Sequence, residues 1–205
     1  MINDLLHQRL NKILPKITSS GFLDGKGIGN EIPFYIFDYP PENELQVRNY
    51  IDTLTQIELK QKLPDRKVVV VNLLKFLLDY IEYRGYSEKF LQIASLPDNT
   101  KTLKSLKSIA GTEKLSGYFV ETIIVRQPEL ILISGVGSVY PVIRVHELLN
   151  NLHRFTGLIP LILFYPGVYD KTTLRLFGKA GLTLDSSTNE RNYSNKYYRA
   201  FRLID

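Results

Sequence analysis

Three side chains that could transfer protons lie at or after apolar, strand-like runs of the sequence. Asp38 lies near the end of PFYIFDY, Asp170 follows PLILFYPGVY, and His146 comes after ELILISGVG. Carboxylates and an imidazole that meet above a sheet could act as general acid and base, in a hydrolase or a nucleotide-dependent enzyme. That chemistry also requires a deep pocket with convergent polar groups. Any parallel α/β protein carries a few such groups at its strand ends, so we expect no catalytic residues.

The glycines and lysines needed to hold a nucleotide are missing from the first strand–helix connection. A P-loop would place GxxxxGK[ST] there, but the sequence is DYPPE, and its prolines lack the N–H groups that cradle a phosphate. The GxGxG string at 25–29 precedes the first predicted strand, so a flexible loop is favoured over a dinucleotide-binding fingerprint. We therefore predict no cofactor.

The segment SGVGSVYP (134–141) follows a predicted strand and leads into a predicted helix. Gly135 and Gly137 allow tight turning, and free N–H groups near Ser138 and Val139 could hold an anion. Pro141 removes one of the donors, and Ser138 does not lie in a GxSxG nucleophile elbow. A structural turn is therefore favoured over an anion site.

Two histidines share one face of the predicted helix at 141–155. His146, Asn150 and His153 recur at spacings of four and three residues, and two such imidazoles could bind a metal with a third ligand. The sequence has no HExxH motif and no cysteine. We predict no metal site, and hydrogen bonding to neighbouring loops is the favoured role of His146 and Asn150.

The excess of positive charge lies in the C-terminal segment. Seven of the 26 basic residues and two of the 21 acidic residues fall between Lys171 and Ile204, which leaves 19 of each elsewhere. Tyrosines and phenylalanines alternate with these basic residues, so the segment could stack on bases and hold phosphates. As the role of these aromatic and basic residues, packing within a strand is favoured first, a protein interface second and nucleic-acid binding third. The residues that would bind nucleic acid are Arg191, Lys196, Arg199 and Arg202.

Apolar runs separated by helical patterns predict the fold. Strands are expected at 33–39, 67–74, 129–137, 160–167 and 196–204, and helices at 3–18, 41–62 and 141–155. Further helices between 73 and 127 form an insertion, residues 172–178 form a short turn or helix, and 185–195 form a polar, mobile loop. This order predicts one domain over residues 1–205. It is an α/β, three-layer fold with a mostly parallel five-stranded sheet and helices on both faces.

The composition is that of a soluble globular protein. Of 205 residues, 44% are hydrophobic and 23% are charged, and the longest apolar stretches are far shorter than a membrane span. The N-terminus is amphipathic and of mixed charge, unlike a signal peptide. The absence of cysteine excludes disulfides and fits a reducing compartment. We therefore expect a cytoplasmic protein without a membrane segment.

Four stretches, always in this order, resemble the BrxB family of the bacterial BREX anti-phage system. They are FYIFDYPPENELQVRNYI, GVGSVYPVIRVHELLNNL, GLIPLILFYPGVYDKTTLRLFG and YYRAFRLI. The resemblance implies a defence component that acts beside PglZ, an alkaline-phosphatase-like protein, and beside the methyltransferase BrxX and other BREX subunits. It brings no established chemistry with it. By analogy of fold alone, the predicted strand arrangement is similar to the core of a P-loop NTPase that lacks the P-loop.

The leading hypothesis is a non-enzymatic assembly or adaptor subunit that binds a PglZ-like partner. The alternatives are a nucleic-acid-binding subunit that uses the basic C-terminal segment, and a degenerate nucleotide-dependent enzyme. The proposed binding surface comprises the loop after the third strand, YPGVYD and the basic C-terminal segment. Its candidate residues are Tyr140, Arg144, His146, Tyr165, Asp170 and Arg175.

Overall fold

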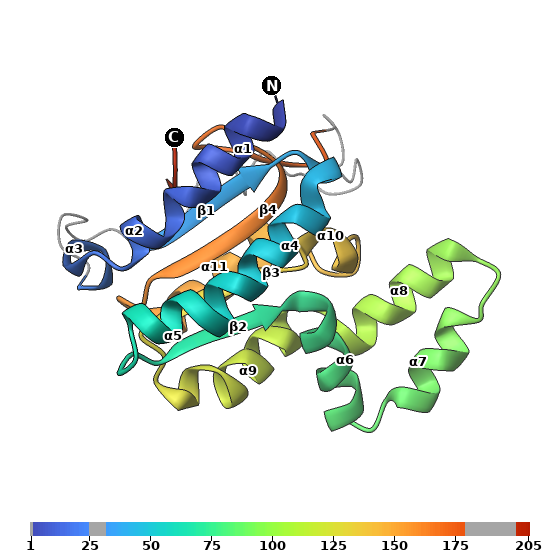
Figure 1. Cartoon of the computed structure of the whole chain (residues 1–205). Coiled ribbons are helices and arrows are strands. Elements are labelled where there is room, and N and C mark those ends of the chain that lie inside the picture. Colours follow the sequence, from blue (N-terminus) through green and yellow to red (C-terminus); the bar gives the residue numbers. More distant parts are fainter. Residues whose placement is uncertain (1, 25–31, 179–199) are drawn as a thin grey trace.

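A computed structural model describes residues 2–24, 32–178 and 200–205, and its centre is a mostly parallel sheet (Figure 1). The strands run in the order β2-β3-β4-β1-β6, all parallel, and β5 pairs antiparallel with β4. Their bounds are β1 Phe34–Tyr39, β2 Val68–Asn72, β3 Leu130–Ser134, β4 Leu161–Tyr169, β5 Leu174–Leu176 and β6 Phe201–Arg202. The predicted α/β fold with helices on both faces is confirmed.

The helices of the N-terminal third cover one face of the sheet. Phe37, Phe164 and Leu132 point to this side and pack with the apolar faces of these helices. Their bounds are α1 Ile2–Asn11, α2 Ile13–Ile17, α3 Ser20–Leu23, the 3-10 turn η1 Pro41–Asn43, α4 Glu44–Thr53, the π-helical turn η2 Leu54–Glu58 and α5 Leu59–Lys62.

The remaining helices belong to the opposite layer. Ile36, Ile133 and Leu163 point to this side, and the buried faces of α6, α9 and α11 share their core. The bounds are α6 Leu73–Tyr83, α7 Ser87–Ala94, α8 Asn99–Ala110, α9 Thr112–Thr122, the 3-10 turn η3 Ile124–Arg126, α10 Val136–Val139 and α11 Val145–Thr156. The predicted helical insertion at 73–127 is this α6–α9 segment, and Figure 1 shows α7 and α8 projecting away from the sheet beyond α6.

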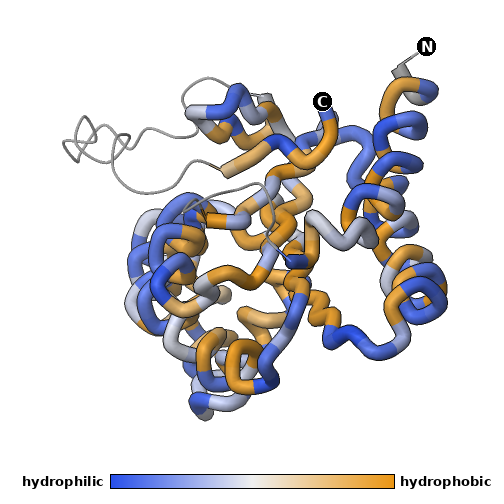
Figure 2. The backbone as a smooth tube through the Cα atoms, turned by 90° about the vertical axis from the view of Figure 1, so that its left-hand side faces the viewer, coloured by the Kyte–Doolittle hydropathy of each residue, from blue (hydrophilic) through white to orange (hydrophobic). Residues whose placement is uncertain are grey.

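Burial explains why the strand-forming runs were recognisable. Every residue of β3, and every residue of β4 except Val168, is buried, as expected for parallel strands covered on both faces. Figure 2 shows these hydrophobic segments inside a shell of more hydrophilic helices. β2 lies at the edge of the sheet and is only partly buried. Among the described residues, none of the helices is long and apolar enough to cross a membrane.

Several details of the predicted elements differ in the structure, and one is the strand expected at 129–137, which ends at Ser134 because Val136–Val139 form α10. The sheet has six strands, because residues 174–176 pair with β4 as β5 where a turn or short helix was expected. The helix expected from Pro141 begins at Val145, and Pro141 follows a cis peptide bond outside it. In the expected strand at 196–204, the structure assigns Phe201–Arg202 as β6, and 196–199 lie outside the described residues. The loops predicted at 25–29 and 185–195 lie wholly outside the described residues.

A buried carboxylate on β1 connects the first helix to the sheet. Asp38 is only 8% exposed, and its Oδ1 accepts a hydrogen bond from Arg9 Nη2 at 2.8 Å. Arg9 Nη1 donates to the main-chain oxygen of Asp38, also at 2.8 Å, and its guanidinium lies 4.7 Å from the ring centre of Phe37. One arginine therefore binds the side chain and the backbone of β1 and covers an aromatic ring.

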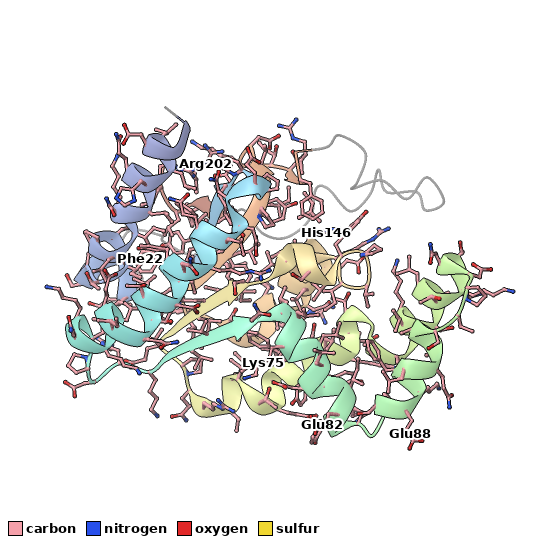
Figure 3. All side chains as sticks on the ribbon, turned by 45° about the vertical axis from the view of Figure 1, so that its right-hand side comes forward. Phe22, Lys75, Glu82, Glu88, His146 and Arg202 are labelled. Carbon is pink, nitrogen blue, oxygen red and sulfur yellow. The ribbon has the colours of Figure 1, made fainter. Side chains whose placement is uncertain are left out.

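The second oxygen of Asp38 connects the C-terminal strand to the same place. Asp38 Oδ2 accepts hydrogen bonds from the Tyr169 backbone N–H at 3.1 Å and from Arg202 Nη2 at 3.4 Å. Arg202 also donates to the Tyr169 carbonyl, and Tyr169 Oη donates to the Ala200 carbonyl at 2.6 Å. Arg202, labelled in Figure 3, thus joins β6 to β4 and β1. We name Arg9, Asp38, Tyr169 and Arg202 the Asp38 network.

The Asp38 network predicts a large loss of stability on substitution of Asp38. Asp38→Ala leaves Arg9 and Arg202 without their carboxylate in a poorly solvated site, which costs about 3 kcal/mol or more of the free energy of unfolding. Urea unfolding followed by circular dichroism measures this loss.

The matched control is Arg66→Ala, which breaks the exposed Arg66–Glu129 ion pair and should leave the unfolding midpoint nearly unchanged. Equal shifts for the two variants would contradict the role assigned to Asp38.

Candidate functional site

A small pocket lies beside the carboxyl ends of β3 and β4. Its volume is about 30 Å³. Four predicted site residues, Tyr140, Arg144, His146 and Tyr165, line it together. His146 lies at the start of α11, close to α10 (Figure 3). The apolar part of the lining consists of Val136, Ile143, Val145, Leu174 and Leu176.

The pocket has the size of a water site. A volume of about 30 Å³ accommodates one or two water molecules, whereas pockets for small molecules typically measure about 300–1,000 Å³. Tyr165 is 1% exposed, and burial, with the nearby Tyr140 phenol as a smaller cause, raises the pKa of Tyr165 well above its ordinary value. At neutral pH the Tyr165 phenol is therefore protonated and uncharged.

The predicted acid–base set is not assembled at this pocket. His146 lines it, but neither Asp38 nor Asp170 is among the lining residues. Both oxygens of Asp38 are bound in the Asp38 network. Asp170 folds a turn, as described next. The two carboxylates therefore hold the structure together at separate places.

Asp170 organises the turn between β4 and β5. Its Oδ1 accepts from Thr172 Oγ1 at 2.7 Å and from the N–H groups of Thr172 and Thr173 at 3.0 and 2.7 Å. Its Oδ2 accepts from Thr173 Oγ1 at 2.6 Å. Hydrogen bonds from the Thr173 and Thr172 hydroxyls, then from the Thr173 N–H, hold the pKa of Asp170 well below its usual range. Lys171, which lies between Asp170 and Thr172, has a φ of 74°, in the left-handed region.

The β4–β5 hairpin folds closely over α10. A Cβ on Gly167 would lie 2.2 Å from the Arg175 carbonyl oxygen, and one on Gly137 would lie 3.0 Å from the Phe177 ring. Only glycine allows these approaches without a shift of the backbone or of the ring. Leu174 and Leu176 of β5 form one wall of the pocket, so the hairpin closes it.

The polar groups at the other strand ends are also engaged within the chain. Asn72 Oδ1, at the end of β2, accepts from the N–H groups of Leu74 and Lys75 and caps α6. The Ser138 N–H donates to the Gly135 carbonyl at 3.2 Å, as expected for the favoured structural turn, and so it is not free for an anion. Gly135 has a φ of 76° and packs against the Asn72 side chain.

A rim cluster of Tyr39, Glu44, Arg48 and Ser138 connects β1, α4 and α10, and the sequence did not reveal it. Tyr39 Oη donates to Glu44 Oε2 at 2.5 Å, and Arg48 Nε donates to Glu44 Oε1 at 2.9 Å. Arg48 Nη2 also donates to Ser138 Oγ at 3.3 Å. Burial, followed by the hydrogen bond to Glu44, raises the pKa of Tyr39. The four-residue spacing of Glu44 and Arg48 on α4 was the one local signal.

The six candidate binding residues fall into two adjoining groups. Tyr140, Arg144, His146 and Tyr165 share the pocket, and Asp170 and Arg175 lie on the hairpin that closes it, with 3.7 Å between Asp170 Oδ2 and Arg175 Nη2. The expectation that Tyr165 lies on the surface is wrong, because alternate residues of β4 point into the two covered faces of the sheet.

The other predicted sites give two further results. Of the nucleic-acid candidates, Arg191, Lys196 and Arg199 lie outside the described residues, and Arg202 belongs to the Asp38 network. In the described part of the chain, no group of three or more His, Cys, Asp or Glu side chains is placed to hold a metal ion.

Comparison with known proteins decides the family. The model of the family "BREX protein BrxB" matches residues 69–203. A protein named "BREX protein BrxB" from Bacillus cereus (strain H3081.97) is 34% identical over 208 residues, with 98% of each chain covered. One of the same name from Escherichia coli O9:H4 (strain HS) is 34% identical over 207 residues, which cover 100% of this chain and 94% of that protein. No solved structure matches significantly.

The chain belongs to the BrxB family. It is therefore a BrxB component of the BREX anti-phage defence system. The family model spans β2 to β6, and so includes the pocket, the hairpin and two members of the Asp38 network, Tyr169 and Arg202. The other two members, Arg9 and Asp38, precede the matched segment, but the full-length relatives align across them.

The turn of this BrxB protein predicts a pH-dependent contribution to stability. Because folding lowers the pKa of Asp170, the wild type gains stability from it above the unfolded value of about 3.9, and loses that gain as the pH falls toward the folded value. Asp170→Asn should therefore destabilise the protein at neutral pH and progressively less below about pH 4.

Urea unfolding at several pH values measures this difference, with Asp65→Asn at an exposed loop position as the matched control. A destabilisation by Asp170→Asn that is independent of pH would contradict the assignment.

Proposed function

We propose that this BrxB chain is a non-enzymatic assembly subunit that binds a PglZ-like partner. Its contact surface, which we name the hairpin surface, consists of the exposed side of β4–β5 and the adjoining pocket mouth. The candidates that remain accessible there are Tyr140, Arg144, His146, Asp170 and Arg175. BrxX and other BREX subunits are further candidate partners.

This proposal rests on one observation: the polar side chains at the strand ends are hydrogen-bonded within the chain. Asp38, Asn72, Ser138 and Asp170 each follow or end a strand, where an α/β enzyme would place its chemistry. Each of them is hydrogen-bonded to another part of the same chain. Such an arrangement fits a folded platform better than a reaction centre.

The hairpin surface has the composition of a protein contact. Val168 and Phe177 are 39% and 37% exposed, and the Arg175 side chain is 43% exposed. Aromatic and arginine side chains are the residues that dominate binding energy in interfaces. Arg175 Nη2 lies 3.7 Å from Asp170 Oδ2, and Arg144 Nη1 lies 4.0 Å from Glu147 Oε1 across one turn of α11.

Tyr165 supports this surface from below. It is buried at the base of the pocket, next to Leu176 and under the hairpin. We expect its substitution to disturb the hairpin indirectly, through packing.

Co-purification tests the proposal. The double variant Arg144→Glu, Arg175→Glu should lose at least about 90% of the PglZ-like partner from the same operon, since reversing two charges in an interface costs several kcal/mol. Arg154→Glu is the matched control, because Arg154 is exposed at the opposite end of α11 and should leave binding unchanged.

Equal recovery of the partner by all three proteins would contradict the assignment of this surface. Failure of the wild type to capture the PglZ-like protein would contradict the adaptor role itself. Thermal unfolding of each variant shows whether a loss of binding results from a loss of folding.

A further inference from the structure

Helix α8 presents a row of lysines that the charge count along the chain did not reveal. Its sequence, NTKTLKSLKSIA, contains Lys101, Lys104 and Lys107 and no acidic residue. Leu103, Leu106, Ile109 and Ala110 form the opposite, inward face, since Ile109 and Ala110 are buried and Leu106 packs against the core. The lysines therefore share the outward face.

The geometry of this face is fixed by the ends of the helix. Asp98 caps α8 by accepting from the N–H groups of Thr100 and Lys101, at 2.9 and 3.1 Å. Lys114 Nζ donates to the Ser108 carbonyl at 2.5 Å, which adds a fourth positive charge at the C-terminal end. Successive lysines are about 4.5 Å apart along the axis, from the rise of 1.5 Å per residue.

The lysines are available to a partner. The Lys101 side chain is 79% exposed, and its contact with Asp98 is a loose 3.8 Å. Lys104 is also exposed, and Lys107 is half-buried at the edge of this face. Figure 1 shows α8 on the part of the insertion that projects away from the sheet, so a large molecule can approach it. Ser105 lies between Lys104 and Lys107 in the sequence, Thr100 and Ser108 flank the three lysines, and their hydroxyls are further donors.

The chemistry of the face indicates phosphates of a duplex. The exposed large hydrophobic side chains of the described residues include none from α8, and the helix has no aromatic residue and no arginine. Protein interfaces are dominated by such anchors, and single-stranded nucleic acid is held by aromatic stacking. Lysines and hydroxyls instead match the sequence-independent contacts that proteins make with a nucleic-acid backbone.

We propose that the outward face of α8 binds the phosphate backbone of a nucleic-acid duplex without reading its sequence. This site is separate from the hairpin surface and from the C-terminal segment. Each lysine neutralises one phosphate and releases a condensed counterion, so the affinity falls with salt.

The test is fluorescence anisotropy with a labelled DNA duplex and the matching single strand, over a range of salt concentrations. The triple variant Lys101→Gln, Lys104→Gln, Lys107→Gln should flatten the plot of log affinity against log salt by about 2.7, from about 0.9 per phosphate contact. At low salt it should weaken duplex binding at least about tenfold. The control triple Lys16→Gln, Lys60→Gln, Lys62→Gln removes the same charge from exposed positions on α2 and α5.

Several outcomes overturn the proposal. They are no duplex binding by the wild type, equal weakening by both triple variants, or equal affinity for duplex and single strand. Loss of the PglZ-like partner by the α8 variant, with DNA binding unchanged, would assign the face to an acidic protein. Loss of duplex binding by the α8 variant, with the PglZ-like partner retained, supports the proposal. Because anisotropy measures duplex binding without the partner, this test does not depend on the adaptor role.

Discussion

The fold depends on a single carboxylate that receives hydrogen bonds from three parts of the chain. Asp38 lies on β1, between β4 and β6, and is bound by Arg9 of α1, by the Tyr169 N–H of β4 and by Arg202 of β6. A buried charge of this kind is tolerated only when its oxygens are fully partnered. These bonds tie the first helix and the last strand to β1, and Figure 1 shows α1 lying alongside β1.

Similar constraints act along the carboxyl edge of the sheet. Asn72 caps α6, Arg48 holds Ser138 to α4, and Asp170 folds the turn that brings β5 over α10. The remaining pocket has the volume of one or two waters. The part of this edge that other molecules can contact is therefore its outer surface. The side chains of Phe177 and Arg175 are exposed there, on and next to the hairpin. The lysines of α8 form a second, chemically different surface on the projecting insertion. We propose that these two surfaces bind different partners.

The sequence predicted the parts of the fold that local pattern determines. The apolar runs around 130–134 and 161–166 became buried parallel strands, since burial on both faces requires such runs. A three-residue strand such as β5 has too few positions for a period to be seen, and its pairing depends on Gly167. The role of Asp38 could not be predicted, because Arg9 and Arg202 lie 29 and 164 residues away in sequence. Tyr140, Arg144, His146 and Tyr165 line one pocket, since the turns after neighbouring parallel strands meet at one edge. The lysines of α8 were overlooked because acidic residues elsewhere balance them in the total.

A double-mutant cycle tests the central claim most directly. The free energy of unfolding is measured for the wild type, Arg9→Ala, Asp38→Ala and the double variant. If Arg9 and Asp38 stabilise the fold through each other, the two losses are not additive, and the coupling is about 1–3 kcal/mol. Additive losses within about 0.5 kcal/mol would mean that the two side chains act independently, and would contradict the account.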